Sequence, residues 1–396
     1  FLMSSSSSEP PVLCETVEPE RFKPMKFKSI PFDANFHPSD SNSVAVGLIT
    51  GSFQLWKIKE NFCYFGYPIH KGSVRCIQFS EDGNTVYTAS QDQTISLFDL
   101  RAEEVVHSFE KAHTHSINKI AVAGKMIISG DDDGYVKIWD TRQKKAVTGF
   151  TKQHYHYISD IKCQTDEKMF FVTSGDQTLG VADLRKMQWI CQSDDMKMDA
   201  MSVAPLHELR RVAVGGSLGS VSLFRWGEWD AYETRVKLKG SVDHIVPLSY
   251  NTIACGCDDG FVRLVGVHPN RQFFEFEAHK GAVIENMRLS HDGTLLSTLS
   301  HDHTIRFWRT EGWPSFIKKA RKKSRPIRAS EDDLSAGIDR VARIRTRVPD
   351  EDEYEFVEEE VEEEVIDPNE QVDELAKEFI TEDKEENLKK IMKIKR

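Results

Sequence analysis

The hydrophobic and polar positions of this chain follow a pattern that recurs seven times. Each recurrence is an apolar block preceded by a turn, and the blocks read SFQLWK, TISLFDLR, YVKIWDTR, TLGVADLR, SVSLFRW, FVRLVGV and TIRFWRT. The positions aligned with Trp139 are Trp56, Phe98, Trp139, Ala182, Phe224, Val265 and Trp308, spaced 41 to 43 residues apart. A fixed period of this length is typical of repeat architectures.

Each repeat predicts several short strands joined by tight turns. A turn residue such as Gly134 stands five positions before each aligned position, and an Asp such as Asp133 stands six positions before it in five of the seven repeats. Gly and Asp favour the backbone conformations of hairpin turns. A second apolar run, such as Val44–Val46, precedes each turn. The repeats therefore predict half-buried strands rather than helices.

The spacing, together with Trp139-Asp140 at the end of a block, resembles the WD-repeat β-propeller, which has four strands per blade. The resemblance implies an all-β, seven-bladed propeller over residues 22–313. Gly312, Trp313 and Pro314 interrupt the last blade. In WD-repeat propellers an N-terminal strand completes the last blade, and residues 22–29 are the candidate here.

The rest of the chain falls into four segments with different compositions. We expect a disordered segment at 1–21, a basic linker at 314–349, an acidic disordered segment at 350–369 and an amphipathic helix at 370–396. The helix follows from apolar residues such as Leu375 and Phe379 at helical spacing, and either a docking partner or the propeller could cover it.

Overall composition excludes several classes of protein. No apolar run approaches the ~20 residues that a membrane helix needs, so we expect no membrane span. The first residues lack a basic region followed by an apolar stretch, so secretion is not expected. The 7 cysteines are scattered and form no CxxC pair, which favours free thiols over disulfides or a zinc site.

The net charge of −11 is unevenly distributed along the chain. Residues 350–364 carry eleven acidic side chains in fifteen; they could shield the basic run, bind basic partners or remain simply solvated. A basic run precedes them and is a nuclear or nucleolar address, an RNA phosphate contact, or only a solubilising linker. Its cations are Lys318, Lys319, Arg321, Lys322, Lys323, Arg325 and Arg328.

The histidines that precede the strands could act either as metal ligands or as structural groups. WD-repeat blades hold a His at this place in a buried network with a Ser or Thr, the turn Asp and the Trp, and the resemblance favours that structural role. By this resemblance the network residues are His279, Ser300, Asp302 and Trp308 in repeat seven; His70, Ser90 and Asp92 in repeat two; and His113, Asp133 and Trp139 in repeat three.

No catalytic motif is present in the sequence: GxSxG, P-loop, HExxH and GxGxxG are all missing. We therefore expect neither an enzyme nor a cofactor. The residues directly before the turn Asp should project at one mouth of the ring. These candidate partner contacts, which could equally be ordinary solvated turn residues, are Gln91, Asp132, Asp258 and His301.

Several longer segments resemble one family. They are GDDDGYVKIWDTR at 130–142, SGDQTLGVADLR at 174–185, GGSLGSVSLFRWGEWD at 215–230, DDGFVRLVGVHPNR at 258–271 and LSHDGTLLSTLSHDHTIRFW at 289–308. They are similar to the family of WD repeat-containing protein 55 and its fungal Jip-five relatives. This resemblance implies a nucleolar, non-catalytic scaffold in ribosomal RNA synthesis or processing and large-subunit assembly. Its expected partners are pre-ribosomal proteins and ribosomal RNA, and we expect a monomer.

A second hypothesis rests on a short motif in the third repeat. Trp139, Asp140 and Arg142 match the WDxR pattern of propellers that dock on the adaptor of cullin-4 ubiquitin ligases. On this reading the chain is a substrate receptor and these residues contact the adaptor. The motif overlaps an ordinary blade end, so Arg142 could equally stabilise its own blade.

Overall fold

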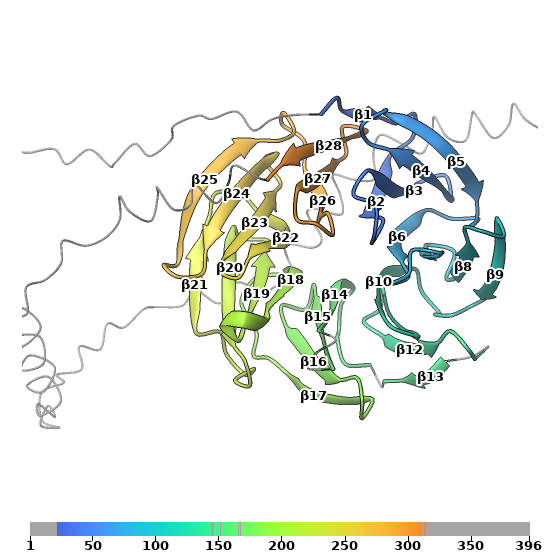
Figure 1. The fold of residues 1–396 in the computed structure, drawn as a ribbon. Helices are drawn as coiled ribbons and strands as arrows, with labels where there is room; N and C mark the ends of the chain where they lie inside the picture. Colours follow the sequence, from blue (N-terminus) through green and yellow to red (C-terminus); the bar gives the residue numbers. More distant parts are fainter. Residues whose placement is uncertain are drawn as a thin grey trace, which may run out of the picture. The chain divides into compact units, whose positions relative to one another are not determined.

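The computed structural model describes residues 22–143, 146–150, 152–164, 166, 168–310 and 313. Within these residues, strands form seven four-stranded antiparallel sheets that follow one another around a ring (Figure 1). The prediction of an all-β, seven-bladed propeller is confirmed. The segments expected at 1–21, 314–349, 350–369 and 370–396 lie outside the described residues, as does the basic run.

The blades are numbered here along the chain, each from its inner to its outer strand. Blade 1 comprises β2 (Pro31–Phe36), β3 (Ser43–Leu48), β4 (Ser52–Lys57) and β5 (Phe62–Pro68). Blade 2 comprises β6 (Val74–Phe79), β7 (Thr85–Ser90), β8 (Ile95–Asp99) and β9 (Glu104–Phe109). Blade 3 comprises β10 (Ile117–Ala123), β11 (Met126–Asp131), β12 (Val136–Asp140) and β13 (Ala146–Gly149).

The remaining blades repeat this order. Blade 4 comprises β14 (Ile158–Gln164), β15 (Met169–Ser174), β16 (Leu179–Asp183) and β17 (Gln188–Gln192). Blade 5 comprises β18 (Ala200–Leu206), β19 (Arg211–Gly216), β20 (Ser220–Arg225) and β21 (Thr234–Lys237), with the short 3-10 helix η1 (His207–Leu209) after β18. Blade 6 comprises β22 (Val242–Ser249), β23 (Thr252–Cys257), β24 (Phe261–Gly266) and β25 (Arg271–Glu277). Blade 7 comprises β26 (Ile284–Leu289), β27 (Leu295–Ser300), β28 (Thr304–Arg309) and β1 (Met25–Lys26).

Strand β1 comes from the N-terminal side of the chain and completes blade 7, as the sequence predicts. Met25 pairs with Ile305 and Lys26 with Thr304. The Met25 side chain is fully buried, and Phe27 packs with it between blades 7 and 1. The ring is therefore closed by non-covalent pairing of two distant segments, which protects the edge of β28.

Each inner strand has a β-bulge after its first residue, at the same place in all seven blades. A bulge redirects the side chains that follow it. Here it turns the third residue toward the next blade: Asp33 Oδ2 accepts the backbone N–H of Ile77 at 2.9 Å. Asp160 Oδ2 accepts the N–H of Val203 at 3.2 Å in the same way.

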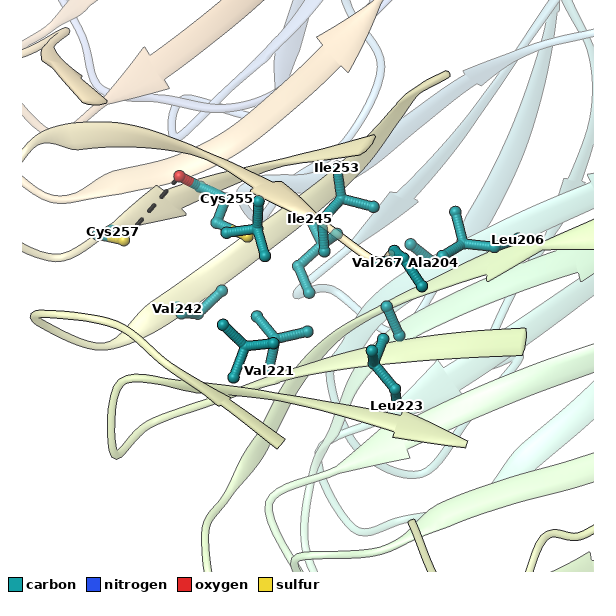
Figure 2. Packing of buried hydrophobic residues seen from close by; sticks show 13 residues of the cluster. Ala204, Leu206, Val221, Leu223, Val242, Ile245, Ile253, Cys255, Cys257 and Val267 are labelled. Atoms are coloured by element: carbon teal, nitrogen blue, oxygen red, sulfur yellow. Dashed lines mark hydrogen bonds between the residues drawn. The ribbon is translucent and has the colours of Figure 1, made fainter. Parts of the chain in front are cut away.

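The core consists of seven apolar clusters, each shared by two neighbouring blades. Figure 2 shows the cluster between blades 5 and 6, where Val221 and Leu223 face Val242 and Ile245. Close approach of the blades leaves no room for a side chain at Gly256, because a Cβ there would lie 2.8 Å from Ile284 Cγ2. Each blade is thus buried on both faces by its neighbours.

The described residues hold no helix that is long and apolar enough to cross a membrane. Six cysteines lie in the described ranges and all of them are free. Cys255 and Cys257 are both buried in β23, as their spacing along a strand suggests.

Candidate functional site

Blade 7 contains a buried chain of hydrogen bonds that starts at its Trp. Trp308 Nε1 donates to Thr298 Oγ1 at 3.0 Å, and Thr298 Oγ1 lies 2.9 Å from His279 Nε2. His279 Nδ1 lies 2.9 Å from Asp302 Oδ2. An ionised carboxylate can only accept, so Nδ1 carries the proton and Nε2 accepts from the Thr298 hydroxyl.

Hydrogen-bond partners stabilise the ionised form of Asp302. Burial alone would raise the pKa of Asp302, but hydrogen bonds from His279 and Thr304 outweigh burial and lower this pKa to about 2. The carboxylate is therefore ionised at neutral pH and keeps His279 in one tautomer. All four side chains are used up within the blade, so the arrangement is structural.

Blades 2 and 3 contain versions of the same network. His113 Nδ1 lies 2.8 Å from Asp131 Oδ2, while Nε2 lies 2.6 Å from Ser129 Oγ, which also accepts from Trp139 Nε1 at 2.8 Å. In blade 2, His70 lies 2.8 Å from Thr88 Oγ1 and 2.7 Å from Thr94 Oγ1. The Asp92 carboxylate lies 3.3 Å from His70 Nδ1.

Two serines assigned to these networks do not take part in them. Ser90 and Ser300 instead accept the backbone N–H groups of Asp92 and Asp302 at 3.1 and 3.4 Å, which caps the turn. The hydroxyl that meets the His belongs to Thr88 or Thr298, two residues earlier on the same face of the strand. Because both hydroxyls lie on one face of the strand, spacing along the sequence does not distinguish them.

The assignment of Asp133 was also wrong. Asp133 binds Lys152 at 2.8 Å, outside the network, and Asp131 is the partner of His113. Asp131 occupies the position of Ser90 and Ser300, and its longer side chain both reaches the His and accepts the N–H groups of the turn. Asp131 therefore caps the turn, as Ser90 and Ser300 do, and also pairs with the His of its blade, as Asp302 does.

Blade 6 has no His before its first strand, and its turn Asp, Asp259, pairs with an Arg instead. The Arg263 side chain is only 2% exposed, and its guanidinium binds Asp259 at 2.6 Å and Glu275 at 3.0 Å. Two carboxylates thus neutralise and hydrogen-bond a buried cation. Sequence reasoning missed this group because it departs from the repeat signature.

The four predicted rim residues all lie at one mouth, formed by the loops between blades and by the turns between second and third strands. We call it the connector mouth. Three of the four already have partners there. Asp132 binds Arg75 at 3.1 Å and Asn118 at 2.7 Å. Gln91 accepts from Ser73, and His301 lies 3.1 Å from Glu285.

Asp258 is exposed, and its carboxylate has no hydrogen bond or ion pair among the described residues. Nearby, burial and the negative charges of Asp258 and Glu285 together raise the pKa of Asp243 to about 6, although the Ser241 hydroxyl donates to this carboxylate. Three carboxylates of blades 6 and 7 therefore repel one another at the connector mouth. We call Asp243, Asp258 and Glu285 the acidic sector.

Exposed apolar side chains occupy the same mouth in blades 4 and 5. Tyr155 is 81% exposed in the loop before β14, and Leu218 is 73% exposed in the turn between β19 and β20. Tyr157 covers the turn of its own blade, where a Cβ on Gly175 would lie 2.5 Å from the Tyr157 ring. Large apolar side chains exposed together in this way are typical of protein contact surfaces.

At the opposite mouth, the three residues of the WDxR motif differ in exposure. Trp139 and Asp140 are buried, so neither can contact a partner. The Arg142 side chain is 71% exposed, and its Nη2 binds Asp140 at 2.6 Å. Asp99 and Asp183 occupy the position of Asp140 in blades 2 and 4, and both accept backbone N–H groups of their turns. The Asp of this motif therefore stabilises a turn.

The part of the chain that the structure describes contains no group of three or more His, Cys, Asp or Glu side chains placed to hold a metal ion. The paired histidines at 113 and 115, 154 and 156, and 301 and 303 are therefore not gathered into such a group. His113 and His154 point instead into their blades, where they bind Asp131 and Asp176.

Seven four-stranded blades, with His–hydroxyl–Asp–Trp networks in blades 3 and 7, define a WD-repeat propeller. The same fold occurs in a chain of a solved structure titled "Crystal Structure of Mitotic Checkpoint Complex", with a TM-score of 0.67 and 15% identity over 78% of this chain and 97% of that chain. At this identity the likeness concerns the fold alone.

More specifically, the chain belongs to the WDR55 family, whose family model matches residues 22–312. WD repeat-containing protein 55 of Arabidopsis thaliana is 36% identical over 285 residues, covering 71% of this chain and 80% of that protein. The Bos taurus protein of the same name is 31% identical, over 68% of this chain and 73% of its own length. The fold and the family suggest a scaffold.

Proposed function

We propose that this chain is a non-catalytic scaffold of ribosome biogenesis in the nucleolus. Membership of the WDR55 family supports the proposal, since the role implied by the family resemblance is ribosomal RNA synthesis or processing and large-subunit assembly. The expected partners are pre-ribosomal proteins and ribosomal RNA. No cofactor takes part in this role.

One observation carries the proposed mode of action: the acidic sector lies at the same mouth as exposed Tyr155 and Leu218. A cationic side chain placed beside Asp258 would relieve the repulsion that raises the pKa of Asp243. The apolar side chains would supply contact area. This combination suits a basic protein segment with apolar residues, and it disfavours phosphate backbones at this mouth.

The test is affinity purification of the tagged chain, with identification of the bound proteins and RNA. We expect pre-ribosomal RNA and large-subunit assembly factors. Asp258→Lys should release the partner bound at the connector mouth, whereas Glu103→Lys, an exposed change in the β8–β9 turn at the opposite mouth, should not. Equal loss in both variants, or no ribosomal material in the wild type, would contradict the proposal.

Localisation has its own test. Neutralising the seven cations of 318–328 should reduce nucleolar accumulation and weaken any salt-dependent RNA binding. Unchanged accumulation would place the nucleolar address elsewhere in the chain.

Arg142 supports a second candidate function, that of a substrate receptor for a cullin-4 ligase. Its guanidinium is exposed and held in place by Asp140, as a contact residue would be. Arg142→Ala should abolish co-purification of the adaptor while leaving the melting temperature nearly unchanged, because exposed ion pairs contribute little. Adaptor binding that survives this change would exclude the receptor function.

A further inference from the structure

Charged side chains of the inner strands surround the axis of the propeller. Lys119 comes from β10, Asp160 and Lys162 from β14, and Arg288 from β26. They occupy the third and fifth positions of their strands, and Asp33 occupies the third position of β2. The charges of Lys119, Lys162 and Arg288 all act on His244 of β22, so the groups lie within electrostatic reach of one another.

The two carboxylates in this group already accept several hydrogen bonds each. Asp160 accepts the N–H groups of Ile161 and Val203, the Ser202 hydroxyl at 2.9 Å and Lys162 Nζ at 3.1 Å. Asp33 accepts the N–H groups of Ala34 and Ile77 and the side-chain amide of Asn286, and Arg288 Nη2 lies 3.7 Å away. Asp160 therefore has no capacity left for another strong donor, and Asp33 already accepts three hydrogen bonds.

Several donors at the axis have no partner among the described residues. Lys119 makes no hydrogen bond or ion pair there, and Arg288 Nε is buried without an acceptor. His244 is only 3% exposed, yet both of its ring nitrogens lack a partner. Buried polar atoms are normally satisfied, so such a concentration indicates a missing partner.

The axis also offers space and positive charge. Lys162 and Arg288 side chains are 22% and 16% exposed, although neighbouring blades and second strands surround their own strands. That exposure therefore faces the axis, which must be wide enough to admit solvent. Three cations face two carboxylates there, so the wall carries surplus positive charge.

We propose that the axis of the propeller binds one small oxyanion of the phosphate or sulfate class between Lys119, His244 and Arg288. The donors come from blades 3, 6 and 7 and so approach from different directions. A polyatomic anion with several acceptor oxygens satisfies such a set better than a single-atom ion. This site is separate from the acidic sector and does not depend on the proposed function.

Inorganic phosphate is the probe, and the full chain is titrated with it by calorimetry against sodium chloride of equal ionic strength. Lys119→Met removes the unpartnered cation and should weaken phosphate binding at least about tenfold. Lys125→Met, an exposed lysine in the β10–β11 turn, should bind like the wild type and controls for phosphate held by basic surface segments. Sulfate should compete with phosphate.

Stability separates a binding role of Lys119 from a structural one. Against the effect of burial, the charges of Asp33 and Asp160 raise the pKa of Lys119, so Lys119→Met should lower the melting temperature in chloride. A binding role predicts in addition that this variant loses the extra stabilisation that phosphate gives the wild type. If Lys119→Met does not fold, His244→Gln serves instead, since it breaks no hydrogen bond that the structure describes. No phosphate-specific binding by the wild type, or equal binding by the Lys119 or His244 variant and the Lys125 control, would overturn the proposal and leave the axis occupied by water alone.

Discussion

Blades 6 and 7 are neighbours with the same four-stranded sheet, but they are held together differently. Blade 6 is one continuous segment, and its buried Arg263 is neutralised by Asp259 and Glu275. Blade 7 takes β1 from the other end of the propeller and has the network of His279, Thr298, Asp302 and Trp308.

The comparison shows that the repeat signature and the blade fold are separable. Blade 6 has Val265 where blade 7 has Trp308, and it has no His before its first strand. It still forms the same sheet, because alternating apolar residues are buried against both neighbours. The signature therefore indicates which partners the buried polar groups of a blade have. The apolar pattern determines whether the blade forms.

The largest loss of stability should come from removing β1, the strand that completes blade 7 from the other end of the propeller. Deletion of residues 1–30 removes Met25 and Phe27 from the contact between blades 7 and 1, at a cost of about 3–6 kcal/mol for these two side chains. Deletion of residues 1–21, which keeps β1, is the control and should cost much less. Chemical denaturation measures both, and cooperative unfolding of the longer deletion at wild-type stability would show that β1 does not close the ring.

In blade 6, the largest loss of stability should come from removing a carboxylate partner of the buried Arg263. Asp259→Ala removes one of two carboxylates from the buried Arg263 and should cost about 3 kcal/mol. Adding Arg263→Met to Asp259→Ala removes the buried charge as well, so the double variant should recover at least half of that loss. Denaturation of the single and double variants measures both values; a double variant less stable than Asp259→Ala would contradict this account.

Blade 7 should respond less strongly to the matching change. Asp302→Ala leaves the proton of His279 Nδ1 without a carboxylate and should cost about 1–3 kcal/mol. Asp133→Ala is the control, since Asp133 is a turn Asp outside its network, and it should change stability by less than about 0.5 kcal/mol. Equal melting temperatures for the wild type and Asp302→Ala would mean that the network does not hold blade 7 together.

The fold could be predicted from the sequence almost entirely, because the seven apolar blocks and their spacing indicate the blades, and the resemblance to WD-repeat propellers implies the origin of β1. The network could be predicted only in part. Asp302, His279 and Trp308 follow from the signature, but Ser300 and Thr298 share one face of β27 and sequence spacing cannot tell which hydroxyl meets the His. Arg263 and the axial group of Lys119 and His244 depend on contacts between distant segments, which no local pattern reveals.

The smallest and most specific effect concerns pH, since blades 6 and 7 contain carboxylates with opposite pKa shifts. The pKa of Asp302 is lowered to about 2 despite burial, because His279 and Thr304 donate to it. Burial and neighbouring carboxylates raise the pKa of Asp243 to about 6. Ionised Asp302 therefore stabilises the propeller, whereas ionised Asp243 destabilises it.

Asn replacements at the two positions should shift stability in opposite directions at pH 7. Asp302→Asn should lower the free energy of unfolding, and this loss should fade only as the pH falls from about 4 to about 2, below the unfolded pKa of 3.8. Asp243→Asn should raise the free energy of unfolding, and this gain should fade as the wild-type carboxyl takes up a proton between about pH 7 and pH 4. Urea unfolding at several pH values measures both differences. No gain for Asp243→Asn at pH 7, or a gain that persists at pH 4, would show that burial and the neighbouring carboxylates do not destabilise ionised Asp243.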